Sequence, residues 1–184
     1  MREEVDLNSN GLCIESAGKL FHNNRWTSRY MVCKKPADLA APIFLVYKNA
    51  AKRRAAQHKT SHPLEFFVGV ESSFELKRQS HTLSILTKGH VIILAFSELK
   101  NVIVWEAWLR NACGQSDCFY MQLLQAPRKS PAVKFVRKEV RLHLHDSFFA
   151  LVHGRPQEVL LFAPLDDLRI LSRSSACFSF NTGA

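Results

Sequence analysis

The segment SELKNVIVWEAWLRNACG, residues 97–114, is the stretch of this 184-residue chain with the clearest helical period. Its apolar residues recur at intervals of three and four and so share one face of a helix: Val102, Trp105, Leu109 and Ala112. Ser97 suits the N-cap, and Gly114 stands where a left-handed residue commonly ends a helix. The sequence therefore predicts one amphipathic helix with a large aromatic residue on its buried face.

Short strand-like segments precede this helix. They are spaced at roughly ten residues: 18–21, 26–33, 43–47, 64–70, 82–87 and 91–96. Residues 48–63 form a long basic loop with enough alanine for a short helix. A lone amphipathic helix needs an apolar surface to cover, and a strongly bent antiparallel sheet offers one at its open end. We therefore expect a mainly β barrel of about seven strands, capped by the helix.

A second series of strand-like segments follows a linker at residues 114–117. These segments are 118–124, 140–145, 148–153, 158–171 and 177–180. A sheet unit of this size buries little surface by itself, so it is either incomplete or leans on the first unit. The expected division is a flexible leader at 1–16, a first domain at 17–114 and a partial second domain at 118–184.

Positive charge is concentrated in one part of the chain. The net charge is +9, and residues 17–60 contain ten Lys or Arg but one acid, Asp38. Such a segment favours an anionic partner, such as membrane headgroups, nucleic acid or phosphorylated protein. No apolar run approaches the length of a membrane span, and the polar N-terminus is unlike a signal peptide. Five cysteines without CxxC spacing indicate reduced thiols and a cytoplasmic protein.

The first unit resembles a pleckstrin-homology domain in its strand series, its basic segments and the Trp105 helix. In that family basic residues of the first hairpin bind inositol phosphates, and Thr27 stands where many lipid binders have a base. The resemblance assigns phosphoinositide binding to a basic set: Lys19, Arg25, Arg29, Lys48, Lys52, Arg53 and Arg54. It thereby implies a phosphoinositide-containing membrane surface as partner.

The second unit is similar to a phosphotyrosine-binding domain of the insulin-receptor-substrate type. The resemblance rests on residues 142–144, 148–151 and 163–169, the last reading APLDDLR. It assigns phosphotyrosine binding to Arg169 and Arg173, whereas Ile170 stands where the family has a second arginine. The later strands and the helix that walls the family's peptide groove have no counterpart before Ala184. We therefore expect phosphopeptide binding to be impaired in this chain.

The tandem order of the two units resembles the downstream-of-tyrosine-kinase docking proteins. This resemblance implies a non-enzymatic cytoplasmic adaptor at the inner face of the plasma membrane. Its first domain would bind phosphoinositides and form a homodimer. Its second would dock to a receptor tyrosine kinase of the muscle-specific type, in neuromuscular synapse formation.

Other functions have less support in the sequence than the adaptor. The sequence has no nucleophile elbow, no Cys-His signature and no glycine-rich phosphate loop, so neither a catalytic site nor a cofactor is expected. His143, His145 and His153 suggest a metal site, but spacing places no further ligand with them, and none is predicted. The alternative is a basic β-barrel that binds nucleic acid. That alternative requires exposed aromatics among the bases, whereas the strand patterns bury Trp26, Tyr30 and Tyr47.

Overall fold

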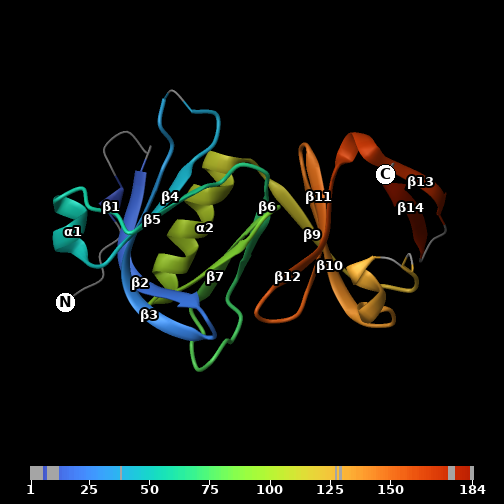
Figure 1. The fold of residues 1–184 in the computed structure, drawn as a ribbon, viewed down its shortest axis with the longest axis horizontal. Helices are drawn as coiled ribbons and strands as arrows, with labels where there is room; N and C mark the ends of the chain where they lie inside the picture. Colours follow the sequence, from blue (N-terminus) through green and yellow to red (C-terminus); the bar gives the residue numbers. More distant parts are fainter. Residues whose placement is uncertain are drawn as a thin grey trace.

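The computed structural model describes residues 6–7, 13–37, 39–126, 128, 130–173 and 177–182 (Figure 1). The elements of the first unit are β1 (Asp6–Leu7), β2 (Cys13–His22), β3 (Arg25–Lys34), β4 (Ile43–Tyr47), α1 (Ala50–Arg54), β5 (Thr60–Pro63), β6 (Phe67–Ser72), β7 (Thr82–Thr87), β8 (Val91–Ala95) and α2 (Leu99–Cys113). Strands dominate both units, and the predicted mainly β architecture with a covering helix is confirmed.

The first unit is a bent antiparallel sheet with the strand order β5-β4-β3-β2-β8-β7-β6. Strand β2 pairs with β3 along its whole length, from Cys13 opposite Lys34 to His22 opposite Arg25. Its second edge pairs with β8, and β1 also pairs with β2. This pairing on both sides joins the two halves of the sheet around one core.

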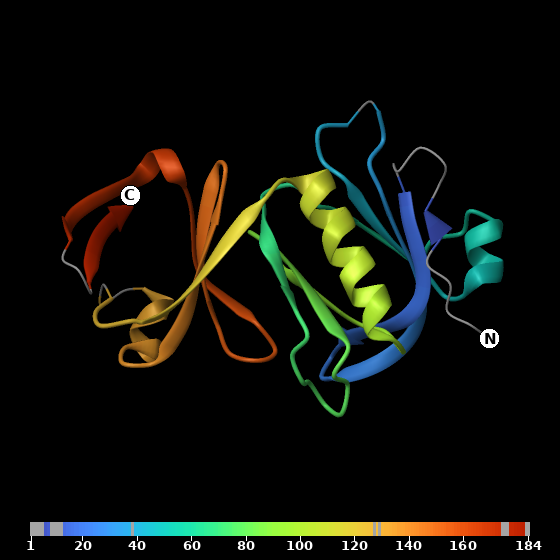
Figure 2. The same cartoon turned by 180° about the vertical axis from the view of Figure 1, so that it is seen from behind.

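Helix α2 lies across the bent sheet and contacts β6 and β7 (Figure 2). Trp105 is 0% exposed in the largest core cluster, which confirms its predicted place on the buried face. Its indole Nε1 donates a hydrogen bond to Ser16 Oγ at 3.0 Å, so this buried polar atom is satisfied. Phe44 and Phe96 flank the ring. Of the helices in the described residues, neither is long and apolar enough to cross a membrane.

The second unit contains a four-stranded antiparallel sheet and a separate hairpin. Its elements are β9 (Ser116–Gln122), the 3₁₀ turn η1 (Pro131–Phe135), β10 (Glu139–His145), β11 (Phe148–His153), β12 (Glu158–Pro164), the 3₁₀ turn η2 (Leu165–Asp167), β13 (Leu168–Arg173) and β14 (Phe178–Thr182). The sheet order is β12-β11-β10-β9, and β13 pairs with β14. The strand segments predicted at 140–145 and 148–153 are present as β10 and β11, which form a hairpin.

Several details differ from the sequence-based expectation. The segment predicted as one strand at 158–171 is divided into β12, η2 and β13. Strand β2 begins at Cys13, inside the expected leader, and Ser16 is tied to the core by the Trp105 indole. Strand β9 begins at Ser116, so half of the expected linker is strand. Residues 60–63 form an additional strand, β5, which pairs with β4. Helix α2 has Glu98 at its N-cap, one residue after the predicted position.

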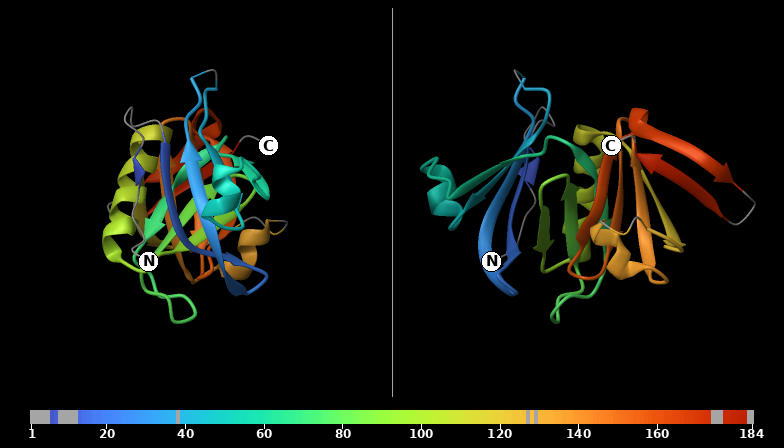
Figure 3. Two further views of the ribbon diagram at one scale, coloured as in Figure 1. Left: turned by 90° about the vertical axis from the view of Figure 1, so that its left-hand side faces the viewer. Right: turned by 45° about the vertical axis from the view of Figure 1, so that its right-hand side comes forward.

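The two units lie side by side and share a buried apolar contact (Figure 3). It joins β6 and β7 of the first unit to β11 of the second through Val68, Leu86, Ala150 and Val152. Gly69 of β6 is also part of this seam. A Cβ atom on Gly69 would lie 2.8 Å from both His143 Nδ1 and Ser116 Oγ, so a larger residue would displace these side chains of the second unit.

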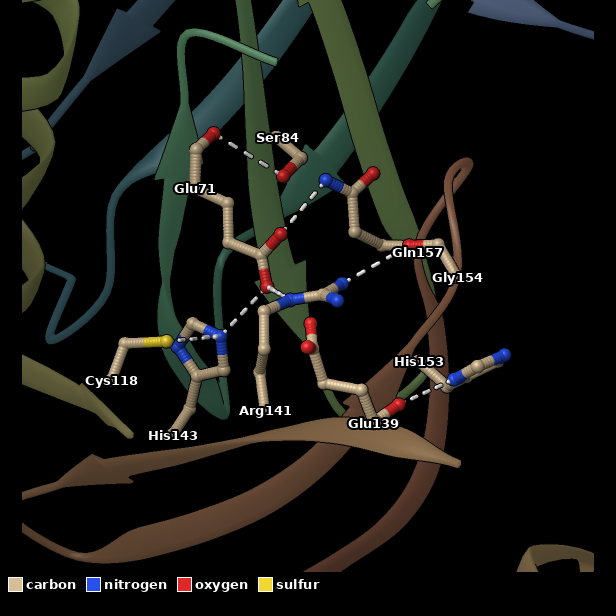
Figure 4. Close-up of polar contacts among 9 residues, drawn as sticks. All are labelled: Glu71, Ser84, Cys118, Glu139, Arg141, His143, His153, Gly154 and Gln157. Atoms are coloured by element: carbon tan, nitrogen blue, oxygen red, sulfur yellow. Dashed lines mark hydrogen bonds and ion pairs between the residues drawn. The ribbon is translucent and has the colours of Figure 1, made fainter. Parts of the chain in front are cut away.

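A buried polar cluster completes the seam (Figure 4). The Glu71 carboxylate of β6 faces three side chains of the second unit. Its contacts are Arg141 Nε at 2.6 Å and His143 Nε2 at 2.9 Å on Oε1, and Gln157 Nε2 at 2.9 Å on Oε2. Arg141 also donates to the Gly154 carbonyl. All four side chains of this Glu71 cluster are buried.

These contacts control the ionisation of Glu71. Burial alone would raise the pKa of its carboxyl group, but the hydrogen bonds from His143, Arg141 and Gln157 outweigh that effect and lower the pKa to about 2. A carboxylate whose pKa is lowered by folding stabilises the fold above its unfolded pKa and loses that contribution as the pH falls. The stabilisation from Glu71 is therefore present at neutral pH.

The place of Trp105 in the core gives a stability prediction. Trp105→Ala should reduce the free energy of unfolding by about 3–5 kcal/mol, because it leaves a large cavity and frees the Ser16 hydroxyl. Ile103→Ala is the control on the same helix, since Ile103 is 58% exposed. Urea unfolding followed by tryptophan fluorescence and circular dichroism measures both. Equal stability of the two variants would contradict the assigned role of Trp105.

The Glu71 cluster gives a pH-dependence prediction. Glu71→Gln should cost about 3–5 kcal/mol at neutral pH, because it leaves the Arg141 guanidinium buried without a counter-charge. In the parent, the contribution of Glu71 to the free energy of unfolding should be lost as the pH falls from about 4.5 to about 2. The variant should not show this loss. The exposed Glu75→Gln is the control. Denaturant titrations at several pH values measure the free energy of unfolding of each protein. The same pH dependence in Glu71→Gln and the parent would refute the role assigned to Glu71.

Candidate functional site

The predicted phosphate-binding residues divide between two places on the first unit. Lys19 and Arg25 lie on the β2–β3 hairpin, near its turn. Lys52, Arg53 and Arg54 lie on α1, between β4 and β5, and Figure 1 shows this helix away from the hairpin turn. Arg29 of β3 and Lys48 after β4 are each one residue beyond the paired residues Tyr30 and Tyr47. The structure therefore presents two basic groups rather than one.

A turn that the sequence analysis did not single out adds two cations to the hairpin group. Leu76 and Gln79 exchange backbone hydrogen bonds of 2.9 and 3.0 Å across a two-residue turn between β6 and β7. The central residues, Lys77 and Arg78, have φ angles of 46° and 65°. Positive φ at both centres defines a type I′ turn, which Asn and Gly adopt most easily. Holding Lys and Arg there costs on the order of 1–2 kcal/mol per residue.

This turn is fixed against the β2–β3 turn, whose central residues Asn23 and Asn24 also have positive φ. Three hydrogen bonds join the two turns: Trp26 Nε1 to the Leu76 carbonyl (3.2 Å), Lys77 Nζ to the Asn24 carbonyl (3.1 Å) and Lys19 Nζ to Gln79 Oε1 (3.2 Å). The cations of both turns are thereby held at one end of the sheet.

We call Lys19, Arg25, Lys77 and Arg78 the turn cluster. None of the four forms an ion pair with any carboxylate of the described residues. Arg25, Lys77 and Arg78 are exposed. Their charge is therefore available to an anion in solution or at a membrane.

The basic residues of α1 are more strongly engaged within the protein. Arg53 Nε lies 2.6 Å from Glu15 Oε2, and its guanidinium lies over the Tyr47 ring. The hydrogen bond with Glu15 raises the pKa of Arg53. Lys52 Nζ donates to Gln57 Oε1 at 2.7 Å, whereas Lys48 and Arg54 are exposed. Of the predicted residues on this loop, Arg53 is thus the least free to bind a ligand.

Lys77 and Arg78 could not be recognised from the density of charge along the sequence. Residues 17–60 hold the charge excess, while these two bases lie in a connection between strands that contains no Gly, Asn or Asp to indicate a tight turn. A Lys-Arg pair at a type I′ turn goes against turn preferences. Strain of this kind gathers at functional sites, and here it supports a role for the two side chains.

Three aromatic residues of the basic segment 17–60 make contacts within the protein. Tyr47 is buried as expected, whereas Trp26 and Tyr30 are half-buried. The Tyr30 hydroxyl donates to Glu15 Oε1, and the Trp26 indole donates to the Leu76 carbonyl. Their rings are therefore poorly placed to stack on bases in the way that single-stranded nucleic acid requires.

The second unit places its predicted phosphotyrosine residues on one strand. Arg169 is exposed on β13, opposite Asn181 of β14. The acidic residues Asp166 and Asp167 of η2 come immediately before this strand, and like charge there opposes a phosphate. Arg173 ends β13, and its side chain lies outside the described residues, as does that of Ile170.

The histidines weighed as metal ligands have other partners. His143 lies in the Glu71 cluster, His145 Nε2 lies 3.0 Å from the Cys113 carbonyl, and His153 Nδ1 lies 2.8 Å from the Glu139 carbonyl. In the part of the chain that the structure describes, no three His, Cys, Asp or Glu side chains are grouped to hold a metal ion. The Glu71 cluster is itself closed, because both carboxylate oxygens are already bound.

The chain was compared with known proteins. No protein-family model matches it. It is 28% identical to Protein Dok-7 of Homo sapiens over 172 residues, which cover 92% of this chain and 33% of that protein. The corresponding identity to Protein Dok-7 of Mus musculus is 27%, with the same coverage. Protein Dok-7 of Takifugu rubripes is 26% identical over 163 residues, 88% of this chain and 31% of that protein.

The chain thus spans about a third of the length of the curated relatives it matches. The matched region includes both β units, because it covers about nine-tenths of the chain. The resemblance to downstream-of-tyrosine-kinase docking proteins is therefore confirmed as a similarity to Dok-7 that extends over nearly the whole chain.

Proposed function

We propose that this chain is a non-enzymatic signalling adaptor that attaches to phosphoinositide-containing membranes through its first unit. The observation that carries the proposal is the turn cluster, in which two fixed type I′ turns hold four cations without ion pairs among the described residues. The similarity to Dok-7 supports the docking role. The expected location is the cytoplasm, at the inner face of the plasma membrane.

The chemistry of the turn cluster suits a phosphorylated headgroup. Arg25 and Arg78 offer paired N–H donors that match phosphate oxygens, while Lys19 and Lys77 add compact charge. Each base close to an anionic bilayer contributes on the order of 1 kcal/mol, and salt screens that attraction. The exposed bases Lys48 and Arg54 would add to the attraction of this unit for the membrane.

The second unit is proposed to face a receptor tyrosine kinase, of the muscle-specific type that the family resemblance implies. Groove-type recognition of a phosphopeptide requires a strand edge, a second wall and several donors for the phosphate. Arg169 supplies one donor, and acidic residues precede it on the chain. We therefore propose that receptor docking by this chain is weak. The homodimer through the first domain remains a proposal that rests on the family resemblance.

Membrane binding can be tested with a variant that removes charge while favouring the turn. Lys77→Asn combined with Arg78→Gly gives the preferred type I′ residues, so its fold should be at least as stable as the parent. Loss of two bases should weaken binding to phosphatidylcholine vesicles containing phosphatidylinositol bisphosphate by roughly 30-fold, from about 1 kcal/mol per base. Vesicle cosedimentation measures the affinity.

The matched control is Lys134→Asn with Arg137→Gly, because Arg137 is also exposed and has a φ of 67°. It removes the same charge from the second unit and should bind as the parent does. A third variant, Lys52→Ala with Arg54→Ala, probes α1. If this variant loses affinity and the turn variant keeps it, the turn cluster is not the site. Tighter binding to single-stranded oligonucleotide than to vesicles, at matched salt, would favour the nucleic-acid alternative.

Receptor-peptide binding provides a second test. A phosphorylated Asn-Pro-x-Tyr peptide should show no phosphate-dependent binding at micromolar concentration, because too few cations converge on its phosphate. Fluorescence anisotropy against the unphosphorylated peptide measures this difference. Arg169→Ala should leave the weak signal unchanged. A phosphate-dependent affinity in the micromolar range or tighter, lost in Arg169→Ala, would overturn the proposal of weak docking.

A further inference from the structure

The connection between β6 and β7 carries a hydroxyl group beside the turn cluster. Ser80 directly follows Gln79, the residue that closes the type I′ turn of Lys77 and Arg78. The side chain of Ser80 is exposed, as are those of Lys77 and Arg78. Residues 77–80 therefore present the sequence Lys-Arg-Gln-Ser at one accessible turn.

This short sequence has the charge pattern that basophilic serine/threonine kinases select. Such kinases recognise two basic residues, three and two positions before the acceptor hydroxyl, through acidic groups beside their catalytic site. Among the pairs of adjacent basic residues in the sequence, Lys77-Arg78 is the one with Ser or Thr two positions after it. The acid of this connection, Glu75, lies five residues before Ser80, outside the positions that such a kinase recognises.

Contacts on both sides of Ser80 hold it near the turn cluster. The preceding residue, Gln79, closes the type I′ turn, and its Oε1 accepts a hydrogen bond from Lys19 Nζ at 3.2 Å. The carbonyl of the following residue, His81, accepts a hydrogen bond from the Phe96 amide at 2.9 Å. A phosphate group on Ser80 would therefore stay beside the cations of the two turns.

From this placement we propose that Ser80 is a phosphorylation site for a basophilic kinase and that its phosphate releases the first unit from the membrane. The release rests on the function proposed above for the turn cluster. A phosphoserine carries about −1.5 to −2 charges at neutral pH and three acceptor oxygens. Beside Arg78 and Lys19, it would cancel about half of the charge of the four cations and occupy N–H donors that a lipid phosphate needs.

The transfer is the ordinary reaction of a protein kinase with MgATP. Ser80 Oγ attacks the γ-phosphorus of ATP, a new O–P bond forms, and the bond from that phosphorus to the β,γ-bridging oxygen breaks. ADP leaves with the bridging oxygen, and the hydroxyl proton passes to the catalytic aspartate of the kinase.

The strain of the turn favours access by a kinase. An acceptor segment binds to a kinase in an extended form, so the turn at residues 77–78 has to open. Lys77 and Arg78 leave the left-handed region when it opens, and the relief of that strain offsets part of the cost of the lost Leu76–Gln79 hydrogen bonds.

Phosphate incorporation tests the modification site without a membrane. The chain is incubated with MgATP and the catalytic subunit of cyclic-AMP-dependent protein kinase, and the phosphorylated residues are mapped by mass spectrometry. Ser80 should be the main acceptor, and Ser80→Ala should abolish its signal. Arg78→Gln should slow the reaction at least about tenfold, because it removes one of the two charges that the kinase recognises.

Ser73→Gly is the matched control in the same connection. Ser73 is also exposed and has a φ of 57°, but none of the seven residues before it is basic. This variant should be phosphorylated at the same rate as the parent. Absence of phosphate from Ser80, or a main acceptor at Ser73, would overturn the assignment of the site.

Vesicle cosedimentation tests the release. The phosphorylated parent should bind phosphatidylcholine vesicles containing phosphatidylinositol bisphosphate about 30-fold more weakly than the unphosphorylated parent, the loss expected for two charges. Ser80→Ala treated with the kinase should bind as it does untreated. Ser80→Asp and Ser80→Asn differ by a single charge, so the first should bind about fivefold more weakly and the second as the parent does. An unchanged vesicle affinity after phosphorylation of Ser80 would refute the release.

Failure of the proposed function would give a different result. The unphosphorylated parent and the variant Lys77→Asn with Arg78→Gly would then bind the vesicles equally. That result would refute the release together with membrane binding by the turn cluster, whereas mass spectrometry would still decide whether Ser80 is a kinase site. Equal melting temperatures of the parent and the Ser80 variants show that the fold is intact.

Discussion

The carboxylate of Glu71 is the constraint on which the arrangement of the two units depends. A buried charge is costly unless each of its lone pairs has a donor, and here the donors come from Arg141, His143 and Gln157. All three belong to the second unit. Since Glu71 is fixed in β6, the second unit has one orientation in which the charge is satisfied. The apolar contact around Val68 adds buried surface between the two units. The Glu71 carboxylate fixes their relative orientation, because its hydrogen bonds are directional.

Much of the fold could be predicted from local patterns. The period of residues 97–114 predicted α2 and the burial of Trp105, because a helix that covers a sheet must repeat its apolar residues. Strand β5 was missed because residues 60–63 are polar and lie at a sheet edge, so no alternation marks them. Ser16 was assigned to a leader because its partner, the Trp105 indole, is remote in sequence.

The candidate site was less accessible to sequence reasoning. Charge density along the sequence indicated Lys19 and Arg25 together with the bases of α1, but it could not show that α1 lies apart from the hairpin turn. Lys77 and Arg78 reach the hairpin through contacts that join residues about fifty positions apart, such as Lys77 with Asn24. Nor could sequence distinguish a histidine of a metal site from His143, whose partner is a carboxylate on the other unit. Polar groups that pair over a long distance in the chain leave no periodic pattern in the sequence.

The Glu71 cluster also bears on the order in which the chain acquires its structure during synthesis. A ribosome completes β6 well before it adds Arg141 and Gln157, and domains generally fold as units from the N-terminus. During that interval Glu71 is a hydrated carboxylate on the surface of a folded first unit. The nascent first unit thus exposes the Glu71 carboxylate and the apolar residue Val68 to solvent until its own continuation covers them.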